Sequence, residues 1–93
     1  MAEIVQNGNR WNVSGDVEID SVNALLNASK ELTIVDDAVV DFSSVAEIDT
    51  GAISLILEWL RRASVEKKQI KFVNLPANLT TLTQLYGVAD LIN

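Results

Sequence analysis

Cysteine and histidine are both absent from this 93-residue chain. Without cysteine there is no disulfide and no thiolate nucleophile, and without histidine the commonest general base and the usual zinc ligands are missing. Carboxylates alone could still act as acid and base, but Asp41, Glu47 and Asp49 have no partner that indicates a tuned pair. We therefore predict that the protein is not an enzyme and uses neither a metal nor a cofactor.

Long apolar runs are also lacking, although 48% of the residues are hydrophobic. No run approaches the roughly 18 to 20 apolar residues that cross a bilayer. The N-terminus has no basic segment followed by an apolar one, as a signal peptide would. We expect a soluble, cytoplasmic protein without direct membrane insertion. Its length suits a single domain over residues 1–93, which can bury about 60–65% of the unfolded surface.

Basic residues are few, seven against thirteen acidic ones, so the net charge is −6. Binding to nucleic acid or an anionic membrane would call for a basic surface, and we expect neither as a main partner. The charge is uneven, because residues 1–50 carry a net −8 and residues 51–93 a net +2. The five bases of the second half lie between Arg61 and Lys71. A helix dipole favours cations at its C-terminus, and an acidic patch on a partner is the alternative explanation.

The remaining pattern is an alternation of strand and helix signals. We expect strands over about 4–6, 11–13, 38–42 and 70–73, and helices over about 20–30, 50–67 and 76–87. Asn7-Gly8 predicts a tight hairpin between the first two strands, and Gly15-Asp16 is expected to end the second. Trp11 is expected to pack inside. Strands separated by helices need crossover connections, so we predict an α/β fold with a mixed four-stranded sheet and about three helices over one face.

The last helix is expected to begin at Pro76, a residue favoured at the first helical position. Gly87 should end it in a left-handed cap. The residues expected on its inner face are Leu79, Leu82, Leu85 and Tyr86.

The segment from Ala38 to Gly51 is the most informative part of the chain. A buried-strand pattern gives way to a short polar loop, and the loop leads to a helix that opens at Asp49-Thr50. Both side chains can accept hydrogen bonds from the first turn of that helix. The positive end of the helix also favours negative charge, either a partner's carboxylate or a phosphate on Thr50. Capping alone is the simpler interpretation, and a regulatory Thr50 within reach of a partner is the functional one.

The long helix after Thr50 carries two apolar stripes. The first must face the core and holds Ile53, Ile56, Leu57, Leu60 and Ser64. The second, about 110° away, holds Ala52, Leu55 and Trp59 and continues with Arg62. Either the first helix or the C-terminal tail covers this stripe, or it is an exposed docking surface. Because Trp and Arg are enriched at interface hot spots, we hypothesise a partner-binding face of Thr50, Leu55, Trp59 and Arg62.

Asp41-Phe42-Ser43 followed by Asp49-Thr50-Gly51 resembles the signature of the STAS domain. This module is shared by anti-sigma factor antagonists and the cytoplasmic tails of sulfate transporters. The resemblance implies a sheet covered by helices on one side. It also implies that the hydroxyl residue, here Thr50, is the regulatory position and possible phosphoacceptor, with Asp49 and Gly51 beside it.

Residues 57–63, 72–79 and 85–88 are similar to one branch of that family, the MlaB or toluene-tolerance STAS proteins of Gram-negative bacteria. This resemblance implies a non-catalytic accessory subunit of a phospholipid-transporting ABC complex that maintains outer-membrane lipid asymmetry. Such a subunit would bind and regulate the ATPase subunit, and would reach the permease and the inner membrane only through that complex.

Two other functions stay open at this point. One is an anti-sigma factor antagonist that is regulated by phosphorylation of Thr50. The other is a lipid or small-molecule carrier, although no converging polar residues define its pocket. A homodimer of the isolated chain is a further alternative, because an uncovered apolar stripe favours self-association.

Overall fold

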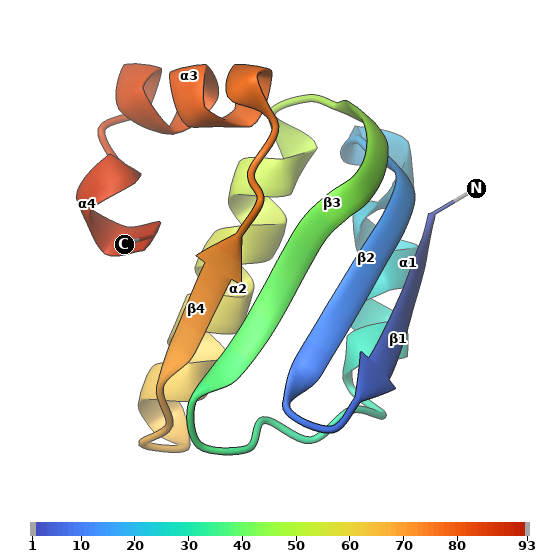
Figure 1. The fold of residues 1–93 in the computed structure, drawn as a ribbon. Helices are drawn as coiled ribbons and strands as arrows, with labels where there is room; N and C mark the ends of the chain where they lie inside the picture. The colour runs from blue at the N-terminus through green and yellow to red at the C-terminus, as the bar shows by residue number, and fades with distance from the viewer. Residues whose placement is uncertain (1, 93) are drawn as a thin grey trace.

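The computed structural model describes residues 2–92, and the side chains of residues 2–90. In this part of the chain the elements are β1 (Glu3–Asn7), β2 (Arg10–Val17), α1 (Ile19–Ser29), β3 (Ala38–Ile48), α2 (Gly51–Val65), β4 (Ile70–Val73), α3 (Ala77–Leu85) and α4 (Ala89–Ile92). The strands form one sheet in the order β1-β2-β3-β4 (Figure 1). β1 and β2 are antiparallel, whereas β2–β3 and β3–β4 are parallel. The expected α/β fold with a mixed four-stranded sheet is confirmed.

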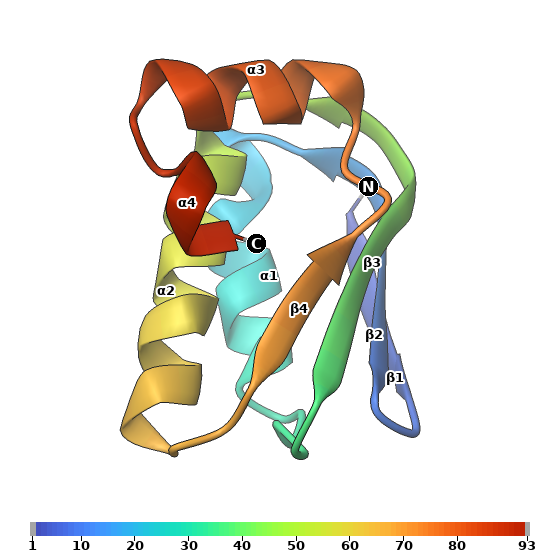
Figure 2. The same cartoon turned by 60° about the vertical axis from the view of Figure 1, so that its left-hand side comes forward.

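Helices α1 and α2 cover one face of the sheet, and the opposite face carries no helix within the described residues (Figures 1 and 2). Each of these helices connects two parallel strands, which requires a crossover on one side of the sheet. Helix α3 lies across the end where β3 and β4 finish (Figure 2). Two of the three expected helices therefore lie over the face, and the third closes its end.

Strands β2 and β3 are longer than the sequence indicates. β3 runs to Ile48 through the expected loop, and β2 continues past Gly15, where we expected it to end. Their pairing shifts register twice, between Asn12 and Ser14 and between Gly15 and Asp16. Gly15 has a positive φ of 83°, which glycine adopts without steric cost. Such bulges interrupt the alternation of inward and outward side chains, so a strand here resembles a polar loop in sequence.

The core fills the space between the sheet and the two covering helices. Trp11 from β2 and Trp59 from α2 meet edge to face, with ring centroids 5.6 Å apart and an interplanar angle of 86°. Phe42 and Phe72 form a second edge-to-face pair at 6.3 Å. The expected packing role of Trp11 is confirmed, since its side chain is fully buried.

The residues that helix α3 buries differ from those expected on its inner face. Leu79 is fully buried, but Leu85 and Tyr86 are 75% and 60% exposed. Leu85 lies six residues after Leu79, about 240° further around the helix, so the two point to different sides. The helix ends at Leu85, which leaves Tyr86 outside it. Gly87 has the positive φ expected of the cap, 69°.

Candidate functional site

The carboxylate of Asp49 joins the beginnings of α1 and α2. Its Oδ1 accepts a hydrogen bond of 2.7 Å from the N–H of Gly51, the first residue of α2. Its Oδ2 accepts one of 3.2 Å from the N–H of Ile19, the first residue of α1. One side chain therefore satisfies unpaired donors at two helix N-termini, so the capping expected at this position is performed by Asp49.

Gly51 lets the two helix beginnings touch. A Cβ atom at this position would lie 2.6 Å from the backbone nitrogen of Ile19 and 2.8 Å from the carbonyl carbon of Glu18. Both neighbours are backbone atoms, which cannot swing aside as a flexible side chain would. Asp49 and Gly51 therefore hold α1 against α2.

Thr50 is different from its two neighbours. It is the N-cap residue of α2, yet its side chain makes no capping hydrogen bond, in contrast to the expectation that it helps to cap the helix. The residue is half-buried and lines a shallow hollow of about 330 Å³ together with Ile19, Gly51, Ile53, Ser54 and Tyr86. Ile19 is 65% exposed and Tyr86 60% exposed. Thr50 thus lines a hollow that is open to solvent and that three apolar or aromatic side chains, Ile19, Ile53 and Tyr86, also line.

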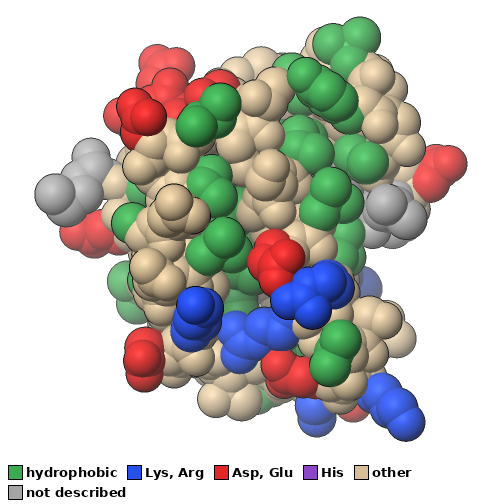
Figure 3. Space-filling view, turned by 180° about the vertical axis from the view of Figure 1, so that it is seen from behind, with side chains coloured by type: hydrophobic (Ala, Val, Ile, Leu, Met, Phe, Trp, Pro, Cys, Tyr) green, Lys and Arg blue, Asp and Glu red, His purple; other side chains and the backbone are tan. Residues whose placement is uncertain are grey.

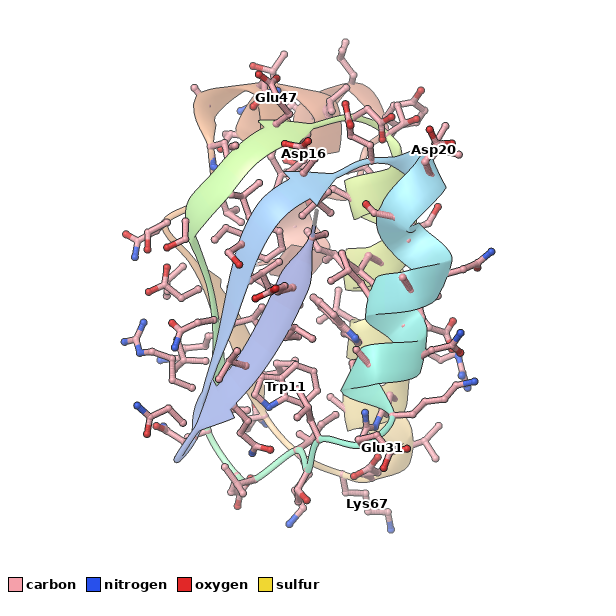
Figure 4. All side chains as sticks on the ribbon, turned by 90° about the vertical axis from the view of Figure 1, so that its right-hand side faces the viewer. Trp11, Asp16, Asp20, Glu31, Glu47 and Lys67 are labelled. Carbon is pink, nitrogen blue, oxygen red and sulfur yellow. The ribbon has the colours of Figure 1, made fainter. Side chains whose placement is uncertain are left out.

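Acidic side chains surround this end of the molecule. The pKa of Glu18 is raised, first by loss of water around its carboxylate and then by repulsion from Asp16, Asp49, Glu47 and Asp20. Figure 4 shows Asp16, Asp20 and Glu47 at the same end of the domain, opposite Glu31 and Lys67. We call Asp16, Glu18, Asp20, Glu47 and Asp49 the acidic rim. Within residues 2–92, no group of three or more acidic, histidine or cysteine side chains is arranged to hold a metal ion.

The structure corrects the hypothesis that Leu55 and Trp59 face a partner. Their side chains are 0% and 1% exposed, because α1 packs over this stripe of α2. The indole N–H of Trp59 donates a 3.0 Å hydrogen bond to the hydroxyl of Ser29, the last residue of α1. Of the two explanations for the second stripe, coverage by the first helix is the right one.

Arg62 completes this contact between the helices. Its guanidinium donates to the carbonyl oxygens of Ser29 at 2.7 Å and Leu32 at 2.5 Å, which lie at and just after the end of α1. It also pairs with Glu66 at 2.9 Å, and its Cζ lies 5.7 Å from the centroid of the Trp11 ring. A cation that satisfies the last carbonyls of a helix stabilises that helix. Arg62 thus holds α1 in place.

The first half of the signature lies in the sheet. Asp41 accepts hydrogen bonds from Asn74 at 3.0 Å and from the N–H of Ser43 at 2.8 Å, and it pairs with Arg10 at 2.7 Å. The Asn74 amide, the Ser43 N–H and the Arg10 charge all lower the pKa of this carboxyl. Asp41 therefore links β2, β3 and the residue after β4.

Of the six predicted site residues, the structure brings Asp49, Thr50 and Gly51 together and buries Leu55 and Trp59 along α2. Sequence reasoning missed Ile19 and Tyr86 as neighbours of Thr50. Tyr86 stands directly before the helix-ending Gly87, which is a signal that it falls outside the regular helix face. Nothing in the sequence pattern identifies Ile19.

The family model described as "Mlab, STAS domain" matches residues 3–93. This chain is a STAS domain of that family. Eighteen solved chains match this STAS domain. The anti-sigma factor antagonist SpoIIAA in its unphosphorylated form is 11% identical, with a TM-score of 0.60, and the match covers 91% of this chain and 83% of that one. At this identity the likeness concerns the fold alone.

A second solved structure, entitled "Crystal Structure Analysis of Mglu", is 20% identical to this STAS domain, with a TM-score of 0.60. The match covers 81% of this chain and only 20% of that one. No curated protein matches the sequence. In the part of the chain that is described, no helix is long and apolar enough to span a membrane.

Proposed function

We propose that this STAS domain is the non-catalytic accessory subunit of a phospholipid-transporting ABC complex of the Mla type. In this role it binds and regulates the ATPase subunit at the cytoplasmic side of the inner membrane, and reaches the permease only through it. The family match over residues 3–93 supports the Mla branch. The observation that carries the proposal is that the side chain of Thr50 caps no backbone N–H, whereas its neighbours Asp49 and Gly51 hold the fold. The Thr50 side chain is thus left for a partner.

The surroundings of Thr50 favour a partner surface of definite chemistry. Ile19, Ile53 and Tyr86 frame a hollow of about 330 Å³, which has room for an apolar side chain of the ATPase. The acidic rim beside it matches lysine or arginine on the partner, and such complementarity sets orientation and association rate. Regulation then follows if the STAS domain binds one arrangement of the ATPase more tightly than another, since only differential affinity shifts a population.

The test is a pull-down from native cells with the wild-type STAS domain and the Thr50→Ala variant, followed by mass spectrometry of partners and bait. We expect the wild type to recover an ABC ATPase and its permease. Thr50→Ala should recover about tenfold less, a loss of about 1.4 kcal/mol of binding energy. Its thermal unfolding should be nearly unchanged, because no capping hydrogen bond is lost.

The matched control is Thr33→Ala, which removes the same groups from an exposed threonine in the loop after α1, far from Thr50. This variant should recover the ATPase as well as the wild type does. If Thr50→Ala recovers as much ATPase as the wild type does, the contact lies elsewhere on the domain. Recovery of no transporter component would reject the proposal.

The second candidate function is an anti-sigma factor antagonist, which the fold likeness to SpoIIAA favours. A phosphate on Thr50 would add about −1.5 to −2 charge beside the acidic rim. The repulsion between this phosphate and the carboxylates of the acidic rim is the physical argument against the antagonist function. Recovery of a kinase-like anti-sigma factor, with a phosphate on Thr50 of the bait, would establish this candidate in place of the transporter subunit.

A further inference from the structure

We propose that the free edge of β4, with the lysine-lined groove beside it, binds an acidic extended peptide segment of a partner by adding a strand to the sheet. This surface lies at the C-terminal end of α2, whereas Thr50 lies at its N-terminal end. A helix of 15 residues is about 22 Å long. The inference therefore concerns a second surface and does not depend on the proposed function.

The backbone of β4 is open on one side. The strand is the last in the sheet order and pairs only with β3 in the described chain. The N–H of Ala38 in β3 donates a 3.0 Å hydrogen bond to the carbonyl of Gln69. Because successive backbone groups of a strand alternate in direction, those of Ile70 and Phe72 point away from β3. Unpaired groups of this kind are a template for another strand.

A groove of about 1000 Å³ runs beside this edge, between β4 and the last turns of α2. Its lining residues are Leu60, Ala63, Ser64, Lys67, Lys68, Gln69, Ile70, Lys71, Phe72 and Val73. Three of these are lysines and none is acidic, in a chain whose net charge is −6. The three ion pairs found among the described residues are made by arginines. The groove is therefore a local concentration of positive charge.

The charge selects the occupant. Lys71 on the edge strand opposes pairing with the same strand of a second copy, because like charges directly opposite each other are destabilising. A strand that carries glutamate or aspartate meets the three lysines instead. Single-stranded nucleic acid needs exposed aromatic rings for stacking, and Phe72, the aromatic residue in this lining, is only 6% exposed.

The shape of the groove adds a sequence preference. Leu60 and Ile70 are half-buried apolar residues in its lining, and the three lysines of the lining are exposed. An added strand directs alternate side chains to opposite faces. A peptide that alternates small apolar and acidic residues would thus place its apolar side chains against the groove and its carboxylates near the lysines. Recognition of this kind takes affinity from the main chain and specificity from the side chains.

The experiment is an NMR titration of the full ¹⁵N-labelled chain with an eight-residue peptide in which glutamate alternates with valine or threonine. We expect the largest shifts at the amides of Ile70 and Phe72. Lys68→Glu should weaken binding at least threefold, while Lys30→Glu, the same charge change on an exposed lysine of another surface, should not. Circular dichroism establishes that both variants are folded.

A second peptide separates strand addition from charge attraction. It has the same sequence but is N-methylated at alternate residues, so it keeps its charge and loses donors on one edge. This peptide should fail to shift the β4 amides. Equal binding of both peptides, an equal effect of Lys68→Glu and Lys30→Glu, or an absence of shifts at β4 would overturn the proposal. Tighter binding of oligouridylate to the same residues would also overturn it.

Discussion

At the residue scale, Asp49, Thr50 and Gly51 have separate physical roles. Asp49 accepts hydrogen bonds from both helix beginnings, and Gly51 leaves the space that their contact needs. Thr50 lies between them at the edge of a solvent-open hollow. A partner can therefore contact the hydroxyl without disturbing the two residues that hold the fold.

Gly51→Ala tests this division. Alanine favours a helix over glycine by about 1 kcal/mol, but the added Cβ would meet backbone atoms at 2.6 and 2.8 Å. Overpacking typically costs about 1–3 kcal/mol, so we expect a net loss in the free energy of unfolding, measured by urea denaturation. Ser54→Ala, at an exposed position of the same helix, is the control and should change little. An unchanged or more stable Gly51→Ala would mean that the two helices do not touch there.

At the element scale, α2 is apolar over a wide arc because it contacts two neighbours. The stripe with Leu55 and Trp59 is fully buried, and Trp59 contacts both Trp11 of the sheet and Ser29 of α1. The other stripe is less buried than expected, because Leu57 and Leu60 are half-buried and Ser64 is exposed. The hydrogen bond from Trp59 to Ser29 and the bonds from Arg62 to the end of α1 fix the contact between α1 and α2. The surplus of apolar surface that suggested docking is thus explained by packing inside the domain.

Asp41 is a polar link within the sheet. Asp41→Asn should remove the part of its stabilising effect that depends on the negative charge. A carboxyl whose pKa is lowered by folding stabilises the folded state above its ordinary pKa, about 3.9, and loses that effect as the pH falls through the lowered value. Asp41→Asn should reduce the free energy of unfolding at pH 7 by about 1 kcal/mol.

The difference between Asp41→Asn and wild type should shrink as the pH falls below about 3.9. The measurement is thermal unfolding of both proteins across pH 2–7. Asp36→Asn, at an exposed position before β3, serves as the control and should follow the wild type. A constant difference between Asp41→Asn and wild type at every pH would show that the charge of Asp41 is not what stabilises the sheet.

At the scale of the whole molecule, the charges are separated. Seen from behind, basic side chains lie in the lower half and a group of acidic side chains lies at the upper left (Figure 3). The acidic rim lies at the end of the domain where α1 and α2 begin, and the groove lysines lie at the other end of α2. Part of the uneven charge along the sequence thus becomes a difference between two ends of the folded domain, whereas Glu31 of the acidic half lies at the same end as Lys67 (Figure 4).

If the proposed function holds, this separation predicts salt-dependent association with the ATPase proposed as the partner. Raising the salt concentration should lower the association rate much more than it changes the dissociation rate, because exposed charges are screened beyond about 10 Å at 0.1 M salt. Glu47→Gln should lower the association rate in the same way. Glu31→Gln removes the same charge at the opposite end (Figure 4) and should not. Surface plasmon resonance measures both rates, and equal effects of the two variants would contradict docking at the acidic rim.

The sequence by itself determined the elements and the motif. The spacing of apolar residues and the turn residues located the strands at Ala38 and Ile70 and the helix after Thr50. These signals depend on neighbours within a few positions. The residues 41–43 and 49–51 likewise identified the family. What only the tertiary structure decided is which apolar residues are covered. Trp59 is buried by α1 and Tyr86 is left exposed beside Thr50, because coverage depends on contacts between segments some thirty residues apart, which no local pattern records.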